Sequence, residues 1–318
     1  MLLLTATLAT CQTADIRESE LQELAEFGDN PGQLRAWFYQ PEQPEALNGL
    51  VVVLHGCGQT AADIAEQSGW NRLAAQHGFA VLYPEQQPGN NMQNCFNWFI
   101  PDDIQRGSGE AASVQHMVQT LAQKLGLGPE QTYLSGLSAG GAMVAVLMAS
   151  YPEAYTAGAI HSGVPYGAAS DLAAGLKTMQ GNTVKSPEEW GALVTAQHAD
   201  YGGPYPRLAI FHGPDDPIVS PINATELVKQ WGALLQADLA QPQEEAGFQD
   251  NERVTRLSYT DAAGNPLLLK YDIDGLGHAW AVDPGTEAQQ GGTVATFAKD
   301  VDFFATYWMA QFFGLANP

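Results

Sequence analysis

Short apolar runs alternate with amphipathic stretches along most of the chain. Runs rich in branched and aromatic residues predict β-strands at 34–39, 49–54, 79–83, 132–135, 157–160, 208–211 and 267–273. Between them, apolar residues at helical spacing predict α-helices at 61–76, 110–125, 139–149, 187–196, 221–235 and 293–313. Most of the strand runs are continuously apolar, which indicates strands that are buried on both faces. This order of elements predicts an α/β fold with a mostly parallel central sheet and helices on both of its faces.

Two long segments, 85–109 and 167–206, fit this alternation poorly. Long loops in a compact domain are often functional, so we expect both segments to form walls of a substrate cleft. No internal repeat, low-complexity tract or linker divides the chain. We therefore expect residues 21–318 to form a single catalytic domain.

The first twenty residues differ in character from the rest. Residues 1–10 are apolar or small and precede Cys11, a pattern typical of the end of a secretory signal. Residues 8–11 (LATC) also resemble the cleavage site of a bacterial lipoprotein, so Cys11 is a candidate lipid anchor. We expect residues 1–20 to be an export signal or a disordered N-terminus, and the protein to be secreted or periplasmic.

The chain has three cysteines, and the other two are Cys57 and Cys95. If Cys11 is removed or lipidated, these two remain as a candidate disulfide pair in an exported protein. Two free buried thiols are the alternative.

Charge excludes several classes of partner. The 318 residues include 13 Lys and Arg against 35 Asp and Glu, which gives a formal net charge of −22. Such a charge repels nucleic-acid phosphates and anionic membrane surfaces, so we expect neither as a partner. No apolar run reaches the roughly 18 residues that a membrane-spanning helix needs.

The strongest chemical signal is the pentapeptide GLSAG at 136–140, which contains Ser138. It follows a predicted strand and opens a predicted apolar helix. A sharp turn between a strand and a helix lifts a serine Oγ above the sheet, and flanking glycines keep the turn free of Cβ clashes. Ser138 is therefore the candidate nucleophile.

A second signal, HGC at 55–57, follows the predicted strand 49–54. In serine hydrolases with this strand–turn–helix motif, a loop of this kind supplies one backbone N–H to the oxyanion of the tetrahedral intermediate. The candidate oxyanion-hole donors are the N–H groups of Cys57 and Ala139. We interpret His55 as a structural residue of the loop.

A nucleophilic serine needs a histidine base and an acid that orients the histidine. Asp215 and Asp216 both lie in a turn after the predicted strand 208–211, and both are candidates for the acid. His278 is the candidate base, because it is the one histidine that follows this turn in the chain.

Other chemistries lack their sequence motifs. The chain contains no dinucleotide-binding or phosphate-binding glycine motif, no HExxH motif and no cysteine spacing typical of zinc. We therefore expect no metal and no organic cofactor.

Several blocks of sequence, spread over about residues 27–313, resemble the esterase/poly(3-hydroxybutyrate) depolymerase family. They include LHGCGQTA (54–61), NCFNWF (94–99), GLSAGGAM (136–143), HGPDDPIVSP (212–221) and GLGHAW (275–280). The resemblance implies an α/β-hydrolase fold and hydrolysis of hydroxyalkanoate esters. It supports Ser138 and His278, and its HGxxDxxV block places the acid at Asp216.

The same resemblance implies a disulfide between Cys57 and Cys95, which would tie the loop containing Trp98 beside the site. Trp98 and Trp280, which lie in two of these blocks, are the candidate substrate-binding side chains, and packing in the core is the alternative for Trp98. Many extracellular depolymerases also carry a C-terminal polymer-binding domain, whereas this chain ends at Pro318. We therefore expect amorphous polymer, oligomers or small esters as substrates rather than crystalline granules.

The leading hypothesis is a serine esterase that hydrolyses poly(3-hydroxybutyrate)-type polyesters or their oligomers through an acyl-enzyme. The first alternative is a feruloyl or acetylxylan esterase, since such carbohydrate esterases share the fold. The second is a catalytically silent polymer-binding protein.

Overall fold

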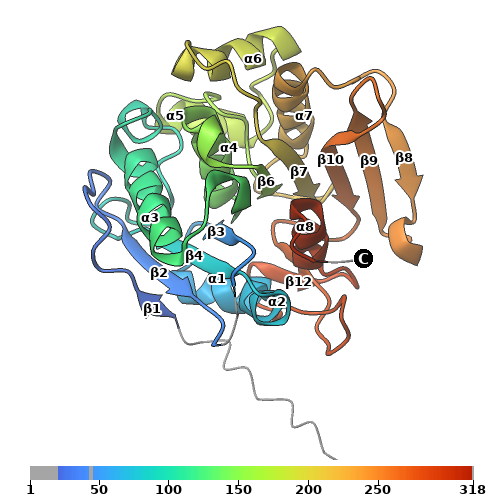
Figure 1. Cartoon of the computed structure of the whole chain (residues 1–318). Helices are drawn as coiled ribbons and strands as arrows, with labels where there is room; N and C mark the ends of the chain where they lie inside the picture. The colour runs from blue at the N-terminus through green and yellow to red at the C-terminus, as the bar shows by residue number, and fades with distance from the viewer. Residues whose placement is uncertain (1–20, 43–45, 317–318) are drawn as a thin grey trace, which may run out of the picture.

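The computed structural model describes residues 21–42 and 46–316, so the expected export signal and Cys11 lie outside the described residues. A large sheet forms its centre (Figure 1). Its strands are β1 (Gln22–Glu23), β2 (Arg35–Tyr39), β3 (Leu50–Leu54), β4 (Ala80–Glu85), β5 (Thr132–Leu137), β6 (Ala157–His161), β7 (Arg207–His212), β8 (Gln243–Ala246), β9 (Val254–Thr260) and β10 (Pro266–Ile273).

The order of strands across the sheet is β1-β2-β4-β3-β5-β6-β7-β10-β9-β8. The six strands from β4 to β10 in this order run parallel, and the strands outside them are antiparallel to their neighbours. Every residue of the outermost strand β8 is exposed. The predicted fold class, an α/β-hydrolase fold with a mostly parallel sheet, is confirmed.

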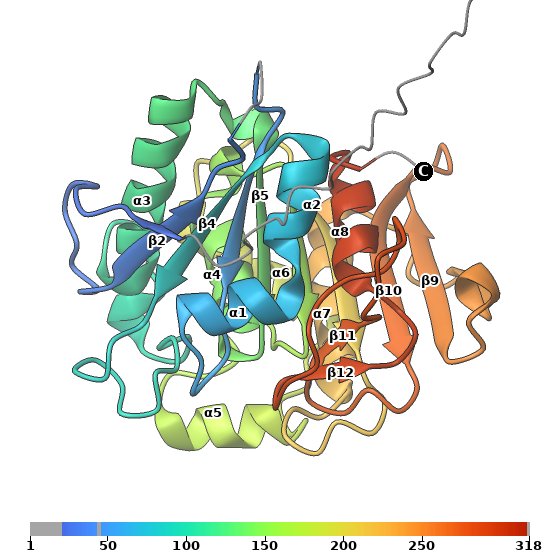
Figure 2. The ribbon, with the colours of Figure 1, turned by 90° about the horizontal axis from the view of Figure 1, so that it is seen from below.

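Helices cover both faces of the sheet (Figure 1). One face carries α1 (Ala61–Ser68), α2 (Trp70–His77) and α8 (Ala305–Phe313), and the other carries α3 (Gly109–Leu125), α4 (Ala139–Ser150), α6 (Pro187–Thr195) and α7 (Ile222–Leu235). The helix α5 (Leu172–Met179) lies apart from both layers, at the lower edge of Figure 2. A small parallel pair is formed by β11 (Trp280–Val282) and β12 (Ala298–Asp300).

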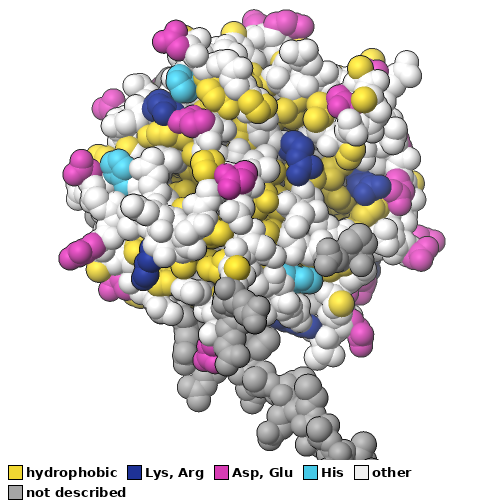
Figure 3. All heavy atoms as spheres, viewed as in Figure 1, with side chains coloured by type: hydrophobic (Ala, Val, Ile, Leu, Met, Phe, Trp, Pro, Cys, Tyr) yellow, Lys and Arg dark blue, Asp and Glu magenta, His cyan; other side chains and the backbone are white. Residues whose placement is uncertain are grey.

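Short 3-10 turns join these elements at Pro101–Asp103, Pro129–Gln131, Pro152–Ala154, Ala196–His198 and Phe248–Asp250. None of the helices in the described part of the chain is long and apolar enough to cross a membrane. Acidic side chains are scattered over the face shown in Figure 3, with few basic ones between them.

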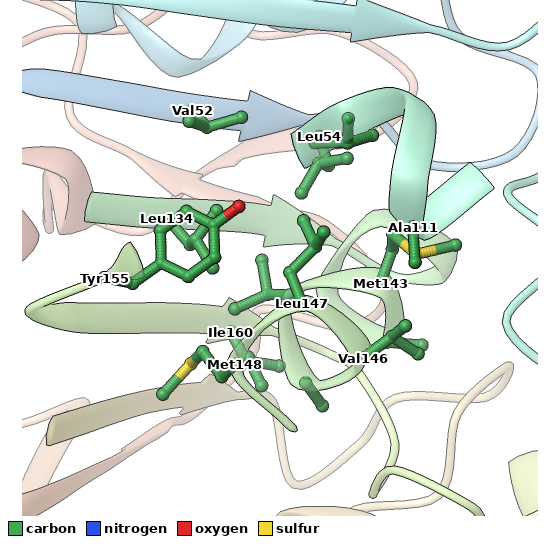
Figure 4. Close-up of a cluster of buried hydrophobic side chains, with 14 of the residues drawn as sticks. Val52, Leu54, Ala111, Leu134, Met143, Val146, Leu147, Met148, Tyr155 and Ile160 are labelled. Carbon is green, nitrogen blue, oxygen red and sulfur yellow. The ribbon is translucent and has the colours of Figure 1, made fainter. Parts of the chain in front are cut away.

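The core explains the continuously apolar strands. All five residues of β3 are buried, and they alternate between the two helical layers. The helix α4 is buried along its whole length. Its side chains, Met143 and Leu147 among them, pack against Leu134 and Ile160 of the sheet (Figure 4). A helix held on all sides gives its N-terminus, next to Ser138, a fixed position.

Two predicted helices differ from the observed ones. The helix expected over 61–76 is broken at Gly69, whose φ of 69° ends α1 before α2 begins. A Cβ on Gly69 would lie 2.8 Å from the Gly292 nitrogen, so the chain needs glycine there. The helix expected over 293–313 is restricted to 305–313, because 298–300 pairs with β11 instead. The strand β9 was not predicted, because most of its residues are half-exposed and lack a continuous apolar run.

Candidate active site

Ser138 forms the connection between a strand and a helix. The strand β5 ends at Leu137 and α4 begins at Ala139. The φ of 56° and ψ of −118° at Ser138 lie outside the regions that most residues adopt. The N–H of Ser138 donates to the carbonyl of His161 at 2.9 Å, which fixes the turn against the neighbouring strand. The turn has the geometry that presents a serine Oγ above the end of the sheet.

Gly140 lies where α4 passes close to the loop after β3. A Cβ at this position would lie 2.2 Å from the carbonyl oxygen of Leu54 and 2.5 Å from that of His55. Because both are backbone atoms, the turn would have to move. We expect Gly140→Ala to lower the free energy of unfolding by about 3 kcal/mol and kcat/KM for p-nitrophenyl butyrate by at least about tenfold.

Urea unfolding and initial rates measure these two effects. Gly202→Ala is the matched control, since no atom of the described residues, its chain neighbours apart, lies within 4 Å of the Cβ that it adds. If both alanine variants behaved like the wild type, the close approach at Gly140 would carry no constraint.

A chain of hydrogen bonds joins three predicted site residues. The Ser138 Oγ lies 2.9 Å from Nε2 of His278, and Nδ1 of His278 lies 2.8 Å from Oδ2 of Asp216. His278 lies in the loop after β10, and Asp216 lies in the turn after β7. Asp215 is exposed, so the geometry selects Asp216 from the two candidates. Three segments that are far apart in the sequence thus meet at the carboxyl end of the parallel strands.

The surroundings of Asp216 keep it ionised. Burial alone raises the pKa of its carboxyl, but hydrogen bonds from His212 and His278 outweigh burial and hold the pKa well below its usual range. The backbone N–H groups of Ile218 and Val219 both donate to Oδ1 at 2.9 Å. An ionised, fully hydrogen-bonded carboxylate fixes Nδ1 of His278 as a donor and leaves Nε2 free to accept.

His212 is a neighbour of this carboxylate whose contribution the sequence analysis missed. Its Nε2 donates to the carbonyl of Val219 at 2.8 Å and lies 3.4 Å from Oδ2 of Asp216. The ring is fully buried. Its position four residues before Asp216, at the end of β7, was the available signal, but sequence alone does not show that the ring turns toward the carboxylate.

The two predicted oxyanion-hole donors lie next to Ser138, since Cys57 lines the same pocket and Ala139 follows Ser138 in the chain. Among the described residues, none accepts a hydrogen bond from the N–H of Cys57 or of Ala139. Ala139 is the first residue of α4, where N–H groups have no partner within the helix and the helix dipole favours negative charge. The N–H of Gly56, in contrast, donates to Oε1 of Gln59 at 2.7 Å. The structure therefore leaves the two predicted donors available.

His55 holds the loop that carries Cys57. Its Nε2 accepts from the N–H of Gln86 at 3.1 Å, so Nδ1 carries the proton and donates to the carbonyl of Gly56 at 2.8 Å. Burial lowers the pKa of His55, despite this bond to Gly56. Both ring nitrogens are thus used within the fold, which agrees with a structural role.

The predicted disulfide between Cys57 and Cys95 is present. It joins the loop after β3 to the long segment after β4. A second link lies beside it, because the N–H of Gly58 donates to the carbonyl of Gln93 at 2.7 Å. The backbone around the Cys57 N–H is therefore attached to the long segment after β4, which forms one wall of the cleft.

That wall is anchored in turn by Glu110, near the start of α3. Its carboxyl group accepts from the N–H of Asn97 at 2.8 Å and from the side-chain amide of Gln86. Glu110 is almost fully buried. Burial first, and then the charge of Asp103, raise the pKa of Glu110 to about 8.

This raised pKa predicts a loss of stability with rising pH. Between about pH 4.5 and 8 the folded protein keeps a proton on Glu110 that the unfolded chain has lost. The free energy of unfolding should therefore fall across this window by up to about 1.4 kcal/mol per pH unit from this group. Glu110→Gln, which is neutral throughout, should lack this slope.

Urea unfolding of both proteins at pH 5 and pH 8 measures the difference. We expect the variant to gain a few kcal/mol relative to the wild type between these two values. A stability difference that is the same at both values would contradict the assignment.

A pocket opens at Ser138. It is lined by Gly56, Cys57, Gln93, Leu137, Ser138, Met179, Ile218, His278 and Phe297. Gln93 and Met179 come from the two long segments that were expected to wall a cleft. Sequence reasoning did not identify Met179, Ile218 or Phe297 individually, because their approach to Ser138 depends on loops with no periodic pattern.

The structure does not bring Trp98 or Trp280 to this pocket. Trp280 is fully buried, and its Nε1 donates to Thr306 at 2.9 Å. Trp98 is 7% exposed and packs beneath α5, where a Cβ on Gly175 would lie 3.4 Å from its ring. Both side chains support neighbouring elements, so the expectation that they contact substrate is corrected.

Three carboxylates gather away from the pocket. Oxygens of Asp283, Asp300 and Asp302 lie within 4.8 Å of one another around β11 and β12. Burial, and then the charges of the two neighbours, raise the pKa of Asp283, although the Gln290 amide opposes them. The group shares no residue with the pocket described above.

The sheet and the linked serine, histidine and aspartate are those of a serine hydrolase with the α/β-hydrolase fold. Residues 36–249 match the family described as esterase PHB depolymerase, and the chain belongs to that family. It is thus a carboxylic ester hydrolase, which excludes the alternative of a catalytically silent binding protein.

Known relatives agree with this class. The chain is 39% identical to poly(3-hydroxyalkanoate) depolymerase C of Paucimonas lemoignei, over 93% of this chain and 70% of the relative. It is 34% identical to feruloyl esterase B of Thermothelomyces thermophilus, over 73% of this chain and 79% of the relative. The solved acetyl xylan esterase from Aspergillus awamori is 25% identical, with a TM-score of 0.79 over 93% of this chain and 100% of that one.

Proposed function

We propose that this esterase hydrolyses poly(3-hydroxybutyrate)-type aliphatic polyesters or their oligomers, with Ser138, His278 and Asp216 as its catalytic triad. The observation that carries the proposal is the hydrogen-bonded chain from Asp216 to Ser138, which ends in an uncharged, largely apolar pocket. The 39% identity to a poly(3-hydroxyalkanoate) depolymerase supports the substrate class.

In the proposed reaction, Ser138 Oγ attacks the ester carbonyl while Nε2 of His278 takes its proton. The N–H groups of Cys57 and Ala139 donate to the oxyanion that forms. His278 then returns the proton to the leaving alcohol, and an acyl-enzyme remains. Water, deprotonated by His278, then attacks the acyl carbon. The C–O bond to Ser138 breaks, His278 returns its proton to Oγ, and the acid product leaves. Asp216 holds the imidazole in position and stabilises its charged form.

A second candidate substrate is the feruloyl or acetyl ester of xylan, which the names of two similar proteins support. The pocket lining favours the polyester. Among the described residues, its lining has four large apolar side chains, Leu137, Met179, Ile218 and Phe297, no Asp, Glu, Lys or Arg, and Gln93 as the one polar side chain besides Ser138 and His278. Sugar hydroxyls placed against the apolar side chains would lose hydrogen bonds to water, and Gln93 alone could replace few of them.

Four substrates distinguish the candidates: amorphous poly(3-hydroxybutyrate), p-nitrophenyl butyrate, methyl ferulate and acetylated xylan. Ser138→Ala is the control for each of them. We expect hydrolysis of the polyester and of the small ester. Activity on methyl ferulate or acetylated xylan with none on the polyester would overturn the proposed substrate class and keep the triad.

We also propose that the protein is exported. The Cys57–Cys95 disulfide supports this, because disulfides persist mainly in oxidising compartments. Mass spectrometry of the natural protein should find a mature chain that begins at or after Cys11, with a lipid mass at its N-terminus if Cys11 is the anchor. A chain that keeps Met1 would overturn export by this signal.

A further inference from the structure

Gln93 lines the pocket, but the proposed reaction does not use it. Among the described residues of the lining, it is the one polar side chain besides Ser138 and His278. It belongs to the long segment after β4 and lies two residues before Cys95. In a largely apolar pocket, a single well-placed polar group commonly fixes the orientation of a ligand. The position of Gln93 therefore raises the question of which substrate atom it would meet.

The backbone of Gln93 is held from both sides. Its carbonyl accepts from the N–H of Gly58 at 2.7 Å, and its N–H donates to Oδ1 of Asn91 at 3.0 Å. The disulfide between Cys95 and Cys57 joins the same two segments close by. The place of Gln93 beside the pocket is thus set by its backbone, and its side chain is not needed for this purpose.

The side-chain amide of Gln93 has no hydrogen-bond partner among the residues that the structure describes. Other amide side chains of the same segment differ in this respect. Those of Gln86, Gln87 and Asn90 all form hydrogen bonds within the fold. Because Gln93 is exposed and lines the pocket, its amide is available to a bound substrate.

Gln93 lies near the proposed oxyanion-hole donor on the loop after β3. The Gly58 that donates to its carbonyl directly follows Cys57, whose N–H would bind the oxyanion. Gln93 and the scissile carbonyl oxygen would therefore share one side of the pocket. In a 3-hydroxyacyl ester, C3 is two bonds away from the scissile carbonyl carbon and carries an oxygen. This oxygen is the nearest polar atom of the acyl unit outside the reacting ester group.

A primary amide matches both chemical forms of the C3 oxygen. Against apolar side chains alone, this oxygen would lose the hydrogen bond that it makes in water. The amide oxygen can accept from the free 3-hydroxyl of a chain end, and the amide NH₂ can donate to the ester oxygens of an internal unit. A plain butyryl ester has no oxygen on C3 and would gain nothing from the amide.

We propose that Gln93 is a specificity-determining residue, whose side-chain amide recognises the C3 oxygen of a 3-hydroxyacyl unit in the pocket. The inference rests on the proposed function for the substrate class. It adds the side chain by which the pocket distinguishes a 3-hydroxyacyl ester from a plain acyl ester of the same length. Gln93 forms and breaks no covalent bond in the reaction.

Two p-nitrophenyl esters test this role, the 3-hydroxybutyrate and the butyrate, which differ only in the hydroxyl on C3. The measured quantity is the ratio of their kcat/KM values. Gln93→Met keeps the length of the side chain and removes both of its hydrogen-bonding groups. We expect this variant to lower the ratio about five- to tenfold, the effect of one hydrogen bond. Damage to the fold would lower both rates and leave the ratio unchanged.

Gln119→Met is the matched control. Gln119 lies on α3, is exposed and does not line the pocket, so its replacement should leave the ratio at the wild-type value. Equal ratios for the wild type and Gln93→Met would overturn the role of Gln93.

Gln93→Glu separates the two halves of the amide, because a carboxylate accepts from a hydroxyl but cannot donate. The third substrate is p-nitrophenyl 3-acetoxybutyrate, whose oxygens on C3 can only accept. We expect its kcat/KM, relative to that of the 3-hydroxybutyrate, to fall about five- to tenfold in this variant. The same relative value in the wild type and in Gln93→Glu would overturn the recognition of internal units.

Hydrolysis of amorphous poly(3-hydroxybutyrate) by the wild type separates this inference from the proposed function. Polymer hydrolysis, together with an unchanged ester ratio in Gln93→Met, would overturn the role of Gln93 and leave the polyesterase function intact. A ratio that falls in Gln93→Met, without any polymer hydrolysis by the wild type, would overturn the polymer as substrate and support Gln93 as a contact for 3-hydroxyacyl esters.

Discussion

Ser138→Ala should lower kcat/KM for p-nitrophenyl butyrate by about 10⁴- to 10⁶-fold, because no other group replaces Oγ as the attacking atom. The residual rate would come from the backbone N–H groups of Cys57 and Ala139, which still bind the oxyanion. The free energy of unfolding should stay within about 1 kcal/mol of the wild type, since the backbone turn does not depend on the hydroxyl.

Ser162→Ala is a matched control for this result. Ser162 also lies just after a parallel strand, is buried and has a positive φ of 46°. Its hydroxyl has no hydrogen-bond partner among the residues that the structure describes, so its removal should leave the rate within about twofold of the wild type. Measurable turnover by Ser138→Ala at near the wild-type rate would overturn the assignment of the nucleophile.

Asp216→Asn should have the second largest effect, a fall of about 10⁴-fold in kcat at neutral pH. An amide can donate to Nδ1 of His278, which would favour the tautomer that carries its proton on Nε2. That nitrogen could then no longer accept the proton of Ser138. The amide would also lose the charge that stabilises the imidazolium during the reaction.

Asp215→Asn provides the comparison, because its side chain is exposed and, of the two aspartates, it is Asp216 that bonds to His278. We expect its kcat to stay within about twofold of the wild type. Rates for the two variants from pH 6 to pH 9 make the measurement. A large loss at Asp215 with little at Asp216 would reverse the choice between them.

Much of the site followed from local sequence, because each part directly follows a strand. Ser138, Asp216 and His278 come after β5, β7 and β10, whose runs rich in branched and aromatic residues are visible in the sequence. The carboxyl ends of parallel strands meet at one edge, so residues that follow such strands are brought close together. The strand pattern, the glycines and the chain order of the triad were sufficient for Ser138 and His278, whereas the preference for Asp216 over Asp215 came from the family resemblance.

The pocket wall was less predictable for a physical reason. Met179 and Phe297 reach the site through contacts between segments that have no local pattern, and the short pairing of β12 replaced an expected stretch of helix. Trp98 and Trp280 show a related difficulty. An aromatic residue beside a catalytic motif can face the substrate or the interior. The contact of Trp98 with α5, and the hydrogen bond from Trp280 to Thr306, decide which, and neither contact is visible in the sequence.

The exposed strand β8 has a consequence for handling this protein. A sheet edge with unpaired backbone groups can add a strand from another molecule, and charged side chains on the edge oppose this. β8 carries Glu244 and Glu245 at its centre. As the pH falls toward the isoelectric point near 4.4, the overall repulsion between molecules disappears. We therefore expect aggregation through this edge in mildly acidic buffers, and storage above neutral pH should prevent it.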